Sequence, residues 1–568
     1  MSELRSLILA VTLSMLVLFS WQYFVQGPKR EQQEHAITLK QQTLKQQQVL
    51  KQVEEANKFK TRENALQEGG RVKIASDFVH GSINLKGARF DDLTLAQFHE
   101  TVDPKSPEVV LLAPSATKQV YFAEFGWIAN KEGIAVPDSN TVWKSEGTTL
   151  SVGKPVKLTW DSPQGLRFVV NIALDEHYMF TITQSVENHG ASAVSLSPYG
   201  LINRTRGTFK PYYISHEGAV GVLDGVLHEV TYAHLTEEKE KYDFPGVKGW
   251  IGIGDKYWLT ALIPPSGETY DARFSHNVKN DIPRFQVDFT GTPVQVAPGG
   301  NVDVVNHFYA GAKKVGILEG YAKSLGITHF DRAVDFGWLY FITKPFFHLL
   351  NFYFGLVGSF GIAILLLTIT IKGIMFPVAN KGYRSMNQLK AYQPEILRMR
   401  ENFKDDRVRM NQELMDFYKR NKISPLSGCL PILIQIPIFF ALYKVLFVTI
   451  EMRHTPFYGW IHDMSAPDPT SVLNLFGLLP FSTPAALTIG AWPLMMGITM
   501  YIQQRLNPPP TDQVQASVMR MMPFIMVFIF SSFPAGLVIY WTWSNILSII
   551  QQRLIAGGLK RQQLKKVS

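Results

Sequence analysis

The chain has 568 residues, enough for several domains, and its Lys and Arg residues outnumber its Asp and Glu residues by nine. That positive balance indicates an anionic neighbour, such as a lipid surface or RNA. The single cysteine, Cys429, excludes an intramolecular disulfide, so any domain outside the cytoplasm must be stable without one.

The first predicted element is a membrane anchor at residues 1–26. Its apolar run is longer than that of a typical signal peptide, and it ends in Trp21, Tyr23 and Phe24, where a cleavage site would need small residues. Aromatic residues suit a membrane interface, so we expect the anchor to stay uncleaved. Residues 27–70 are rich in Gln, Lys and Glu and predict a polar linker without a packed core.

Residues 71–330 change to a period of two. Segments such as "LRFVVNIAL" and "YMFTITQSVEN" alternate or are rich in β-branched and aromatic residues, and turn residues separate them. This pattern predicts an all-β sandwich. The segment contains no Gly-x-Ser-x-Gly motif, no P-loop, no Cys pair and no metal-ligand spacing of His, so we expect no enzyme activity, no metal and no small-molecule cofactor.

Residues 331–353 are strongly aromatic and predict an amphipathic helix in the membrane interface, bent at Pro345. Five further spans follow as a core at 354–556, and they are expected at 354–376, 428–449, 485–503, 519–533 and 535–556. The fourth is short, because Met521–Phe533 as a helix covers only about 20 Å of a hydrocarbon layer of roughly 30 Å. We therefore expect snorkelling flanks or local thinning of the bilayer.

Loop charges predict the orientation. Residues 379–425 hold 11 Lys or Arg and 6 acidic residues, and the tail 557–568 is basic, whereas 451–484 holds one Arg and no Lys. Positive loops stay in the cytoplasm, so both termini are expected inside and the β domain outside. Lys29 and Arg30, which follow the first span, favour the opposite orientation. We give the later loops more weight, because long domains cross the membrane regardless of their charge.

Residues 379–424 carry two amphipathic stretches with "KDD" between them, which suits a turn and an N-cap. They predict a helical hairpin in the cytoplasm, with Pro394 starting or kinking its first arm. A solvated amphipathic linker is the alternative.

Lys372 is the one charge in the apolar run "ILLLTITIKGIMFP", where an ammonium costs roughly 3 kcal/mol or more. It lies about one turn from Pro377, so its side chain can snorkel to the interface. Other spans also carry polar residues; these are Thr368, Gln435, Ser531, Ser532, Ser544, Asn545 and Ser548. Hydrogen bonds between helices explain them, and so does a shared wet cavity that also holds Lys372.

Three stretches carry a resemblance to a known family: "KGIMFP" at 372–377, "SPLSGCLPILIQIPIFFALYKVL" at 424–446 and "FPAGLVIYWTWSNILSIIQQRLI" at 533–555. The whole chain resembles the YidC family of Oxa-type membrane protein insertases, in the Gram-negative form with a large periplasmic domain. The resemblance implies a multi-pass α-helical membrane protein with six spans. Five of them form the core, with an inserted β-supersandwich domain in the periplasm.

In that family a positively charged residue, usually Arg, occupies the position of Lys372 in a hydrophilic groove that is open to the cytoplasm and to lipid. Lys retains the charge but lacks the bidentate fork of Arg. The resemblance implies a groove formed by Lys372, Thr368, Gln435, Ser532 and Asn545. It also implies a client-contacting surface at Phe439, Met496, Tyr540 and Trp541, for which ordinary lipid-facing residues are the alternative.

The implied function is insertion of client transmembrane segments into the bacterial inner membrane, and chaperoning of their folding, alone or with the Sec translocon. Nascent membrane proteins and membrane lipids are the implied partners, and the basic hairpin and tail would meet the ribosome and the targeting receptor. Two other hypotheses are a secondary transporter with Lys372 in the substrate path and a lectin-like envelope module with an anchor. The chain has no repeated halves, which argues against the transporter.

Overall fold

A computed structural model describes residues 59–205, 215–237, 241–279, 282–403, 406–421, 430–479, 488–507 and 513–567. The predicted anchor at 1–26 and the linker up to residue 58 lie outside these ranges. The described residues form two compact units, 59–69 with Ala113–Val120, and the rest from Gly70 onward. In the described part of the first unit, helix α3 (Arg62–Leu66) begins after Thr61, whose side chain accepts a hydrogen bond from the Asn64 N–H.

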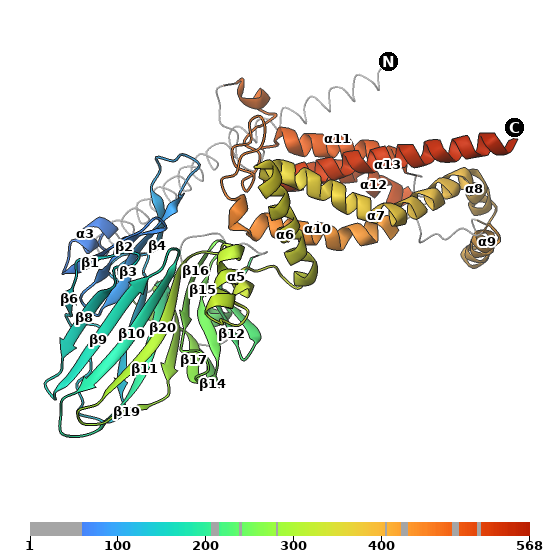
Figure 1. Ribbon diagram of the computed structural model, residues 1–568. Coiled ribbons are helices and arrows are strands. Elements are labelled where there is room, and N and C mark those ends of the chain that lie inside the picture. The colour runs from blue at the N-terminus through green and yellow to red at the C-terminus, as the bar shows by residue number, and fades with distance from the viewer. Residues whose placement is uncertain are drawn as a thin grey trace, which may run out of the picture. The chain divides into compact units, whose positions relative to one another are not determined.

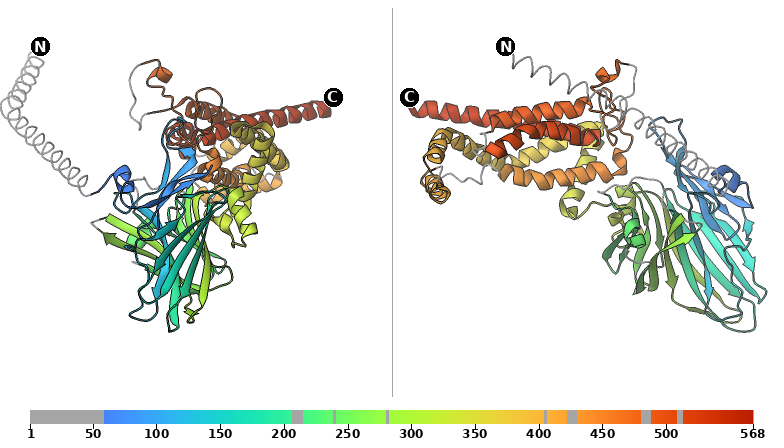
Figure 2. Two further views of the ribbon diagram at one scale, coloured as in Figure 1. Left: turned by 60° about the vertical axis from the view of Figure 1, so that its left-hand side comes forward. Right: turned by 180° about the vertical axis from the view of Figure 1, so that it is seen from behind.

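The second unit contains two large β-sheets (Figures 1 and 2). The first sheet has the order β14 (Lys241–Val247), β17 (Tyr270–Lys279), β18 (Ile282–Gly291), β11 (Val194–Thr205), β5 (Tyr121–Ala129), β3 (Arg89–His99), β2 (Val79–Asn84), β1 (Arg71–Ala75) and β7 (Thr149–Leu150), with β19 (Val294–Val296) on β11 and β4 (Glu108–Leu112) on β3. The second has the order β13 (Val226–Thr231), β12 (Gly218–Leu223), β15 (Gly249–Gly254), β16 (Trp258–Ile263), β20 (Asn301–Ala312), β10 (Met179–Asn188), β9 (Leu166–Leu174), β8 (Val156–Asp161) and β6 (Lys144–Glu146).

The two sheets face each other across one hydrophobic core. Burial alternates along β10, as expected for strands with one face inward. The ring of Phe90 on β3 packs edge-on against Phe180 on β10, with 5.4 Å between the ring centroids. Tyr121 and Thr260 share a hydrogen bond of 2.6 Å between the sheets. This arrangement confirms the predicted β-rich domain.

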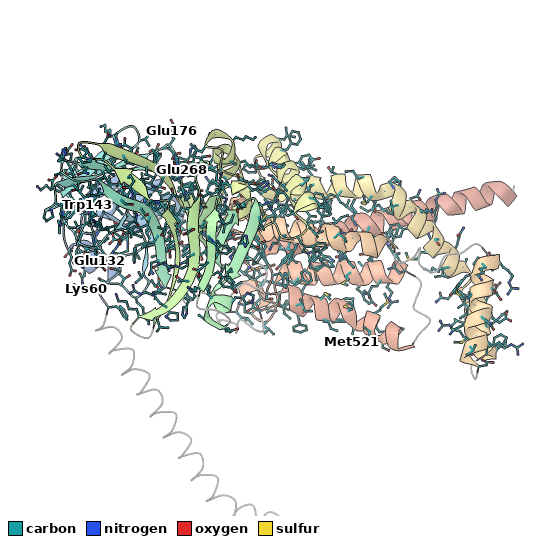
Figure 3. The ribbon with its side chains drawn as sticks, turned by 90° about the horizontal axis from the view of Figure 1, so that it is seen from below. Lys60, Glu132, Trp143, Glu176, Glu268 and Met521 are labelled. Atoms are coloured by element: carbon teal, nitrogen blue, oxygen red, sulfur yellow. The ribbon has the colours of Figure 1, made fainter. Side chains whose placement is uncertain are left out.

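Most charged side chains lie on the outside of the sandwich, although a few, such as Asp91, Glu124 and Arg204, are buried in ion pairs. Glu132, Glu176 and Glu268 are exposed, whereas Trp143 is buried (Figure 3). Among the described residues, no group of three or more His, Cys, Asp or Glu side chains is placed to hold a metal ion.

Helix α4 (Tyr232–Glu237) lies between two strands of the β domain. After the last strand, α5 (Val315–Ser324), η2 (Phe330–Ala333) and α6 (Tyr340–Val357) lead to the helical region. Lys344 on α6 ties these together, because its Nζ lies 2.8 Å from Glu319 Oε1 on α5 and 2.6 Å from Asp331 Oδ2. Burial by itself would lower the pKa of Lys344, but its bonds to Asp331 and Glu319 raise it above the ordinary value.

The C-terminal region is helical, as predicted. Its helices are α7 (Phe360–Ala391), α8 (Gln393–Asn402), α9 (Arg407–Arg420), α10 (Leu430–Val448), α11 (Ala491–Leu506), α12 (Gln513–Phe530) and α13 (Ala535–Val567). In the described part of the chain, α7 is the helix long and apolar enough to cross a membrane, and Gln435–Val448 and Ala516–Phe530 are shorter apolar helices. The six-span count therefore stays a prediction.

The break between α6 and α7 lies at Gly358 and Ser359, a few residues after the expected start of the span at 354. Gly358 ends α6 with φ of 67°, a left-handed conformation that glycine adopts without steric cost. Beyond it, α7 continues through Pro377 to Ala391 as a single helix, so the residues expected to open the hairpin at 379 belong to α7.

Helices α8 and α9 pack on each other through a small core of Ile396, Leu414 and Phe417. The side chain of Asp406 accepts a hydrogen bond of 2.9 Å from the Arg409 N–H and so caps α9, as the "KDD" sequence predicts. Whether this pair lies in the cytoplasm stays a prediction.

Candidate functional site

Lys372 lies on α7, and its half-buried side chain is directed toward two other helices. Its Nζ donates to Oε1 of Gln435 on α10 over 3.3 Å and to Oγ of Ser548 on α13 over 2.9 Å. The ammonium is therefore held by neutral hydrogen-bond acceptors from two helices that are far apart in the sequence.

The acceptors are themselves held in place. Gln435 Nε2 donates to the Tyr540 hydroxyl over 3.0 Å, which fixes the amide with its oxygen toward Lys372. The Ser548 hydroxyl donates to the Ser544 carbonyl one turn earlier on α13, at 2.9 Å, and so leaves its lone pairs for the ammonium. The result is a continuous polar cluster of Lys372, Gln435, Tyr540 and Ser548, which we call the Lys372 cluster.

The other three predicted groove residues lie on α7, on α13 and in the turn after α12. Thr368 is buried one turn before Lys372, where its hydroxyl donates to the Ile364 carbonyl. Asn545, on α13, donates to the Thr499 hydroxyl on α11 over 3.2 Å. Ser532 is exposed in the turn after α12, where its hydroxyl donates to the Ile529 carbonyl.

The structure does not bring Ser532 to the Lys372 cluster. Ser548 lies 13 residues after the first residue of α13, and at 1.5 Å per residue it is about 20 Å along that helix from the turn that holds Ser532. The hydroxyl at Lys372 comes from Ser548, one of the polar residues of the last predicted span.

The helices around Lys372 carry no negative charge. The sequences of α7, α10, α11, α12 and α13 contain neither Asp nor Glu. A cation without a carboxylate partner in an apolar layer keeps its full attraction for an incoming anion. The absence of acidic residues from these helices is visible in the sequence alone, and it identifies Lys372 more clearly than the scattered serines do.

Aromatic side chains form a second group beside the Lys372 cluster. The rings of Phe439 on α10 and Trp541 on α13 are 4.5 Å apart and edge-on, and Phe530 on α12 lies 4.9 Å from Trp541. Met496 and Tyr540, in contrast, are buried with 0% and 2% of their surfaces exposed. Of the predicted client surface, the structure therefore brings Phe439 and Trp541 together and places Met496 and Tyr540 inside the helix packing.

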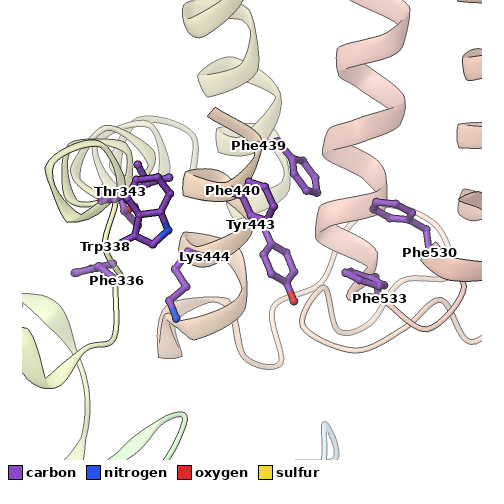
Figure 4. A pocket seen from close by; sticks show the side chains of 11 residues that line it. Phe336, Trp338, Thr343, Phe439, Phe440, Tyr443, Lys444, Phe530 and Phe533 are labelled. Carbon is purple, nitrogen blue, oxygen red and sulfur yellow. Dashed lines mark hydrogen bonds between the residues drawn. The ribbon is translucent and has the colours of Figure 1, made fainter. Parts of the chain in front are cut away.

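Phe439 also lines an apolar cavity of about 370 Å³ (Figure 4). Its walls are Phe336, Gly337, Trp338, Leu339, Thr343, Phe439, Phe440, Tyr443, Lys444, Phe530 and Phe533. The one charged wall residue is Lys444, whose Nζ is 2.7 Å from Asp335 Oδ2. Burial by itself would raise the pKa of Asp335, but Lys444 and the His216 N–H lower it below its ordinary value.

Two family models match the chain. Residues 71–349 match the model described as the YidC periplasmic domain, and residues 352–562 match the model described as a 60 kDa inner membrane protein. Together they cover the β domain and the helical region.

Curated relatives agree over nearly the full length. The chain is 48% identical over 557 residues to a membrane protein insertase YidC of Rickettsia massiliae, which covers 98% of this chain and 99% of the relative. It is also 48% identical over 567 residues to the insertase YidC of Rickettsia bellii, with the same coverage. A crystal structure of an active YidC insertase has 14% identity and a TM-score of 0.35, and covers 85% of this chain and 92% of that one. These relatives give no support to the transporter hypothesis, and the chain belongs to the YidC family of membrane protein insertases.

Proposed function

We propose that this insertase moves client transmembrane segments into the inner membrane through a hydrophilic groove centred on Lys372. The observation that carries the proposal is a cation held by Gln435 and Ser548 among five helices whose sequences lack Asp and Glu. Such a charge is costly in hydrocarbon and is normally retained for function.

The proposed step is physical rather than covalent. Each charge in the polar flank of a client faces a penalty of several kcal/mol at the centre of the bilayer. A wet groove around Lys372 shortens the path through the apolar layer, and the ammonium attracts acidic residues in the short outer tail of the client. Partitioning of the client into lipid and the membrane potential supply the driving force.

The client's apolar segment leaves the groove sideways. Phe439 and Trp541 are suited to this contact because their rings meet at the junction of α10, α12 and α13. Met496 and Tyr540 support that surface from within: Tyr540 fixes Gln435, and Met496 packs in the helix core.

The proposed topology has six spans, with both termini in the cytoplasm and the β domain in the periplasm. Support comes from the loop charges and from the family model that describes residues 71–349 as a periplasmic domain. The apolar part of α12, Ala516–Phe530, would cover about 22 Å as a helix, which favours local thinning of the bilayer.

The α8–α9 pair and the tail 557–568 are proposed to form the cytoplasmic contact surface. The tail is basic, and so is the segment 379–425 that contains the α8–α9 pair, with 11 Lys or Arg and 6 acidic residues. This charge suits the ribosome, the targeting receptor and anionic lipid. Cooperation with the Sec translocon is proposed on family membership alone.

Depletion of the protein in cells tests the function. Insertion of small membrane proteins with short outer tails should fail, whereas uptake of solutes should continue until secondary effects set in. Unimpaired insertion with a prompt loss of uptake of one solute would contradict the proposal and favour a transporter.

A further inference from the structure

The loop between α10 and α11 has two parts with different surroundings. Its first part, up to Ser471, is folded over the helix ends: Ile461 and Met464 are buried, and the Gly536 N–H at the start of α13 donates to the Met464 carbonyl over 3.0 Å. Asp468 is buried as well, and it accepts hydrogen bonds from the Trp492 N–H at 2.9 Å and from the Trp460 indole at 3.1 Å.

The second part, residues 472–479, turns its apolar side chains outward, and we call it the apolar turn. The exposed fractions are 51% for Leu473, 52% for Leu475, 51% for Phe476, 82% for Leu478 and 40% for Leu479. Backbone hydrogen bonds from Phe476 to Ser471 and from Leu479 to Asn474, at 2.7 and 3.1 Å, hold the segment in a defined turn. The exposed leucines are thus presented by an ordered backbone.

The sequence on both sides of the apolar turn contains no charged residues. No Asp, Glu, Lys or Arg occurs in the 36 residues from Pro469 to Gln504. Exposed loops of the β domain differ: the turn at 101–106 includes Asp103 and Lys105. A contiguous set of exposed apolar side chains without charges marks an interaction surface.

The position of the apolar turn identifies its partner. The turn begins where the Val472 N–H donates to the Ile489 carbonyl over 3.0 Å, directly before α11, and the loop as a whole joins the ends of α10 and α11. Both helices are proposed to span the membrane, so the turn lies at the level of the outer lipid head groups. Exposed Tyr458 and Trp460 in the same loop are residue types typical of that level.

We propose that the apolar turn inserts into the outer leaflet of the inner membrane and contacts lipid acyl chains. This inference rests on the proposed placement of α7 and α10–α13 across the bilayer. Insertion beside α11 anchors the outer end of the helical core in the lipid.

Depth-dependent fluorescence quenching in vesicles tests the inference. Leu478→Cys, and Leu475→Cys as a second position, are made in the full chain with Cys429→Ser and labelled with one fluorophore. Val142→Cys is the matched control in the β domain, since Val142 is 67% exposed, and Ile374→Cys, 65% exposed on α7, reports membrane placement. The vesicles contain lipids with a nitroxide either near the head group or deep in the acyl chain.

We expect both apolar-turn labels to lose fluorescence to the nitroxide lipids, more with the shallow nitroxide than with the deep one, while the Val142 label is unaffected. The inference is overturned if the apolar-turn labels behave like the Val142 label while the Ile374 label is quenched; the proposed function then stands. Labels shielded from aqueous iodide but not quenched by lipid would reveal a protein partner and also overturn it. If the Ile374 label is unquenched too, the membrane placement itself is wrong.

Discussion

The Nζ of Lys372 on α7 lies 2.9 Å from the Oγ of Ser548 on α13, across 176 positions of sequence. This contact turns the ammonium toward the interior of the helical bundle, with Gln435 completing its shell. The direction of the side chain favours a role inside the bundle over simple snorkelling toward head groups.

Removal of the Ser548 hydroxyl should weaken this orientation. A hydrogen bond to a charged group contributes about 1.5–3 kcal/mol, so we expect Ser548→Ala to slow insertion of clients with acidic outer tails by at least roughly 10-fold. The measurement is the initial insertion rate into vesicles. Ser531→Ala is the matched control, because the Ser531 hydroxyl, in the turn after α12, donates to the Phe528 carbonyl and not to the Lys372 cluster. Equal rates for both variants would show that Ser548 does not position Lys372.

The ion pairs of Lys344 should stabilise the junction between the sandwich and α6. Both pairs of Lys344 are largely shielded from solvent, so Lys344→Ala should lower the free energy of unfolding by about 2 kcal/mol, between the values for exposed and buried pairs. Thermal unfolding of the full chain in detergent measures this. Lys157→Ala, which removes an exposed pair with Glu146 at 3.7 Å, should change stability by less than about 0.5 kcal/mol. Similar losses in the two variants would contradict the structural role of Lys344.

Glu451 should make stability depend on pH. Burial raises its pKa from 4.5 to about 7, although the Val315 N–H and Lys314 act in the opposite direction. The folded state then binds the proton that the unfolded state releases between pH 4.5 and 7, so this residue lowers stability as pH rises through that window.

Glu451→Gln should therefore be more stable than the parent protein at pH 8, by about 3 kcal/mol at most, and equal to it near pH 4.5. Melting temperatures of the two proteins at several pH values measure the difference. An advantage that stays constant with pH would mean that Glu451 does not titrate in this range.

Gly497 should be required for the contact between α11 and α12. A Cβ at this position would lie 2.4 Å from Val527 Cγ2, so Gly497→Ala forces Val527 to move and should cost about 1–3 kcal/mol. The double variant with Val527→Ala removes the clashing methyl groups. Recovery of part of the lost melting temperature in the double variant is expected; an additive further loss would show that the two helices do not meet there.

The sequence was sufficient for the main architecture because periodicity and charge report burial directly. The alternation in "LRFVVNIAL" predicted the sandwich strand β9, and the "KDD" segment predicted the cap at Asp406. The charge of Lys372 within an apolar run, together with the family resemblance, pointed to that residue as the centre of the site. What periodicity could not supply was the pairing of helices distant in sequence.

Two site residues illustrate that limit. Ser532 and Ser548 are equivalent as interruptions of apolar spans, and only the packing of α7 against α13 places Ser548 at the ammonium. The family resemblance implied Tyr540 as part of a client-contacting surface, yet its hydroxyl is bound by Gln435 and its ring is buried. A Tyr side chain, with an apolar ring and a polar hydroxyl, can either contact a client at the surface or pack inside with its hydroxyl hydrogen-bonded. Residue type alone therefore does not determine which of these positions it takes.

The most direct test of the Lys372 mechanism varies both charges at once. Vesicles containing the parent protein, Lys372→Arg, Lys372→Ala or Lys372→Glu receive pairs of clients that differ only in whether the short outer tail is acidic or neutral. We expect acidic-tailed clients to insert normally with Arg, more slowly with Ala and least with Glu, while neutral-tailed clients insert at similar rates throughout. Normal insertion of the acidic-tailed clients by the Ala and Glu variants would contradict an electrostatic role for Lys372.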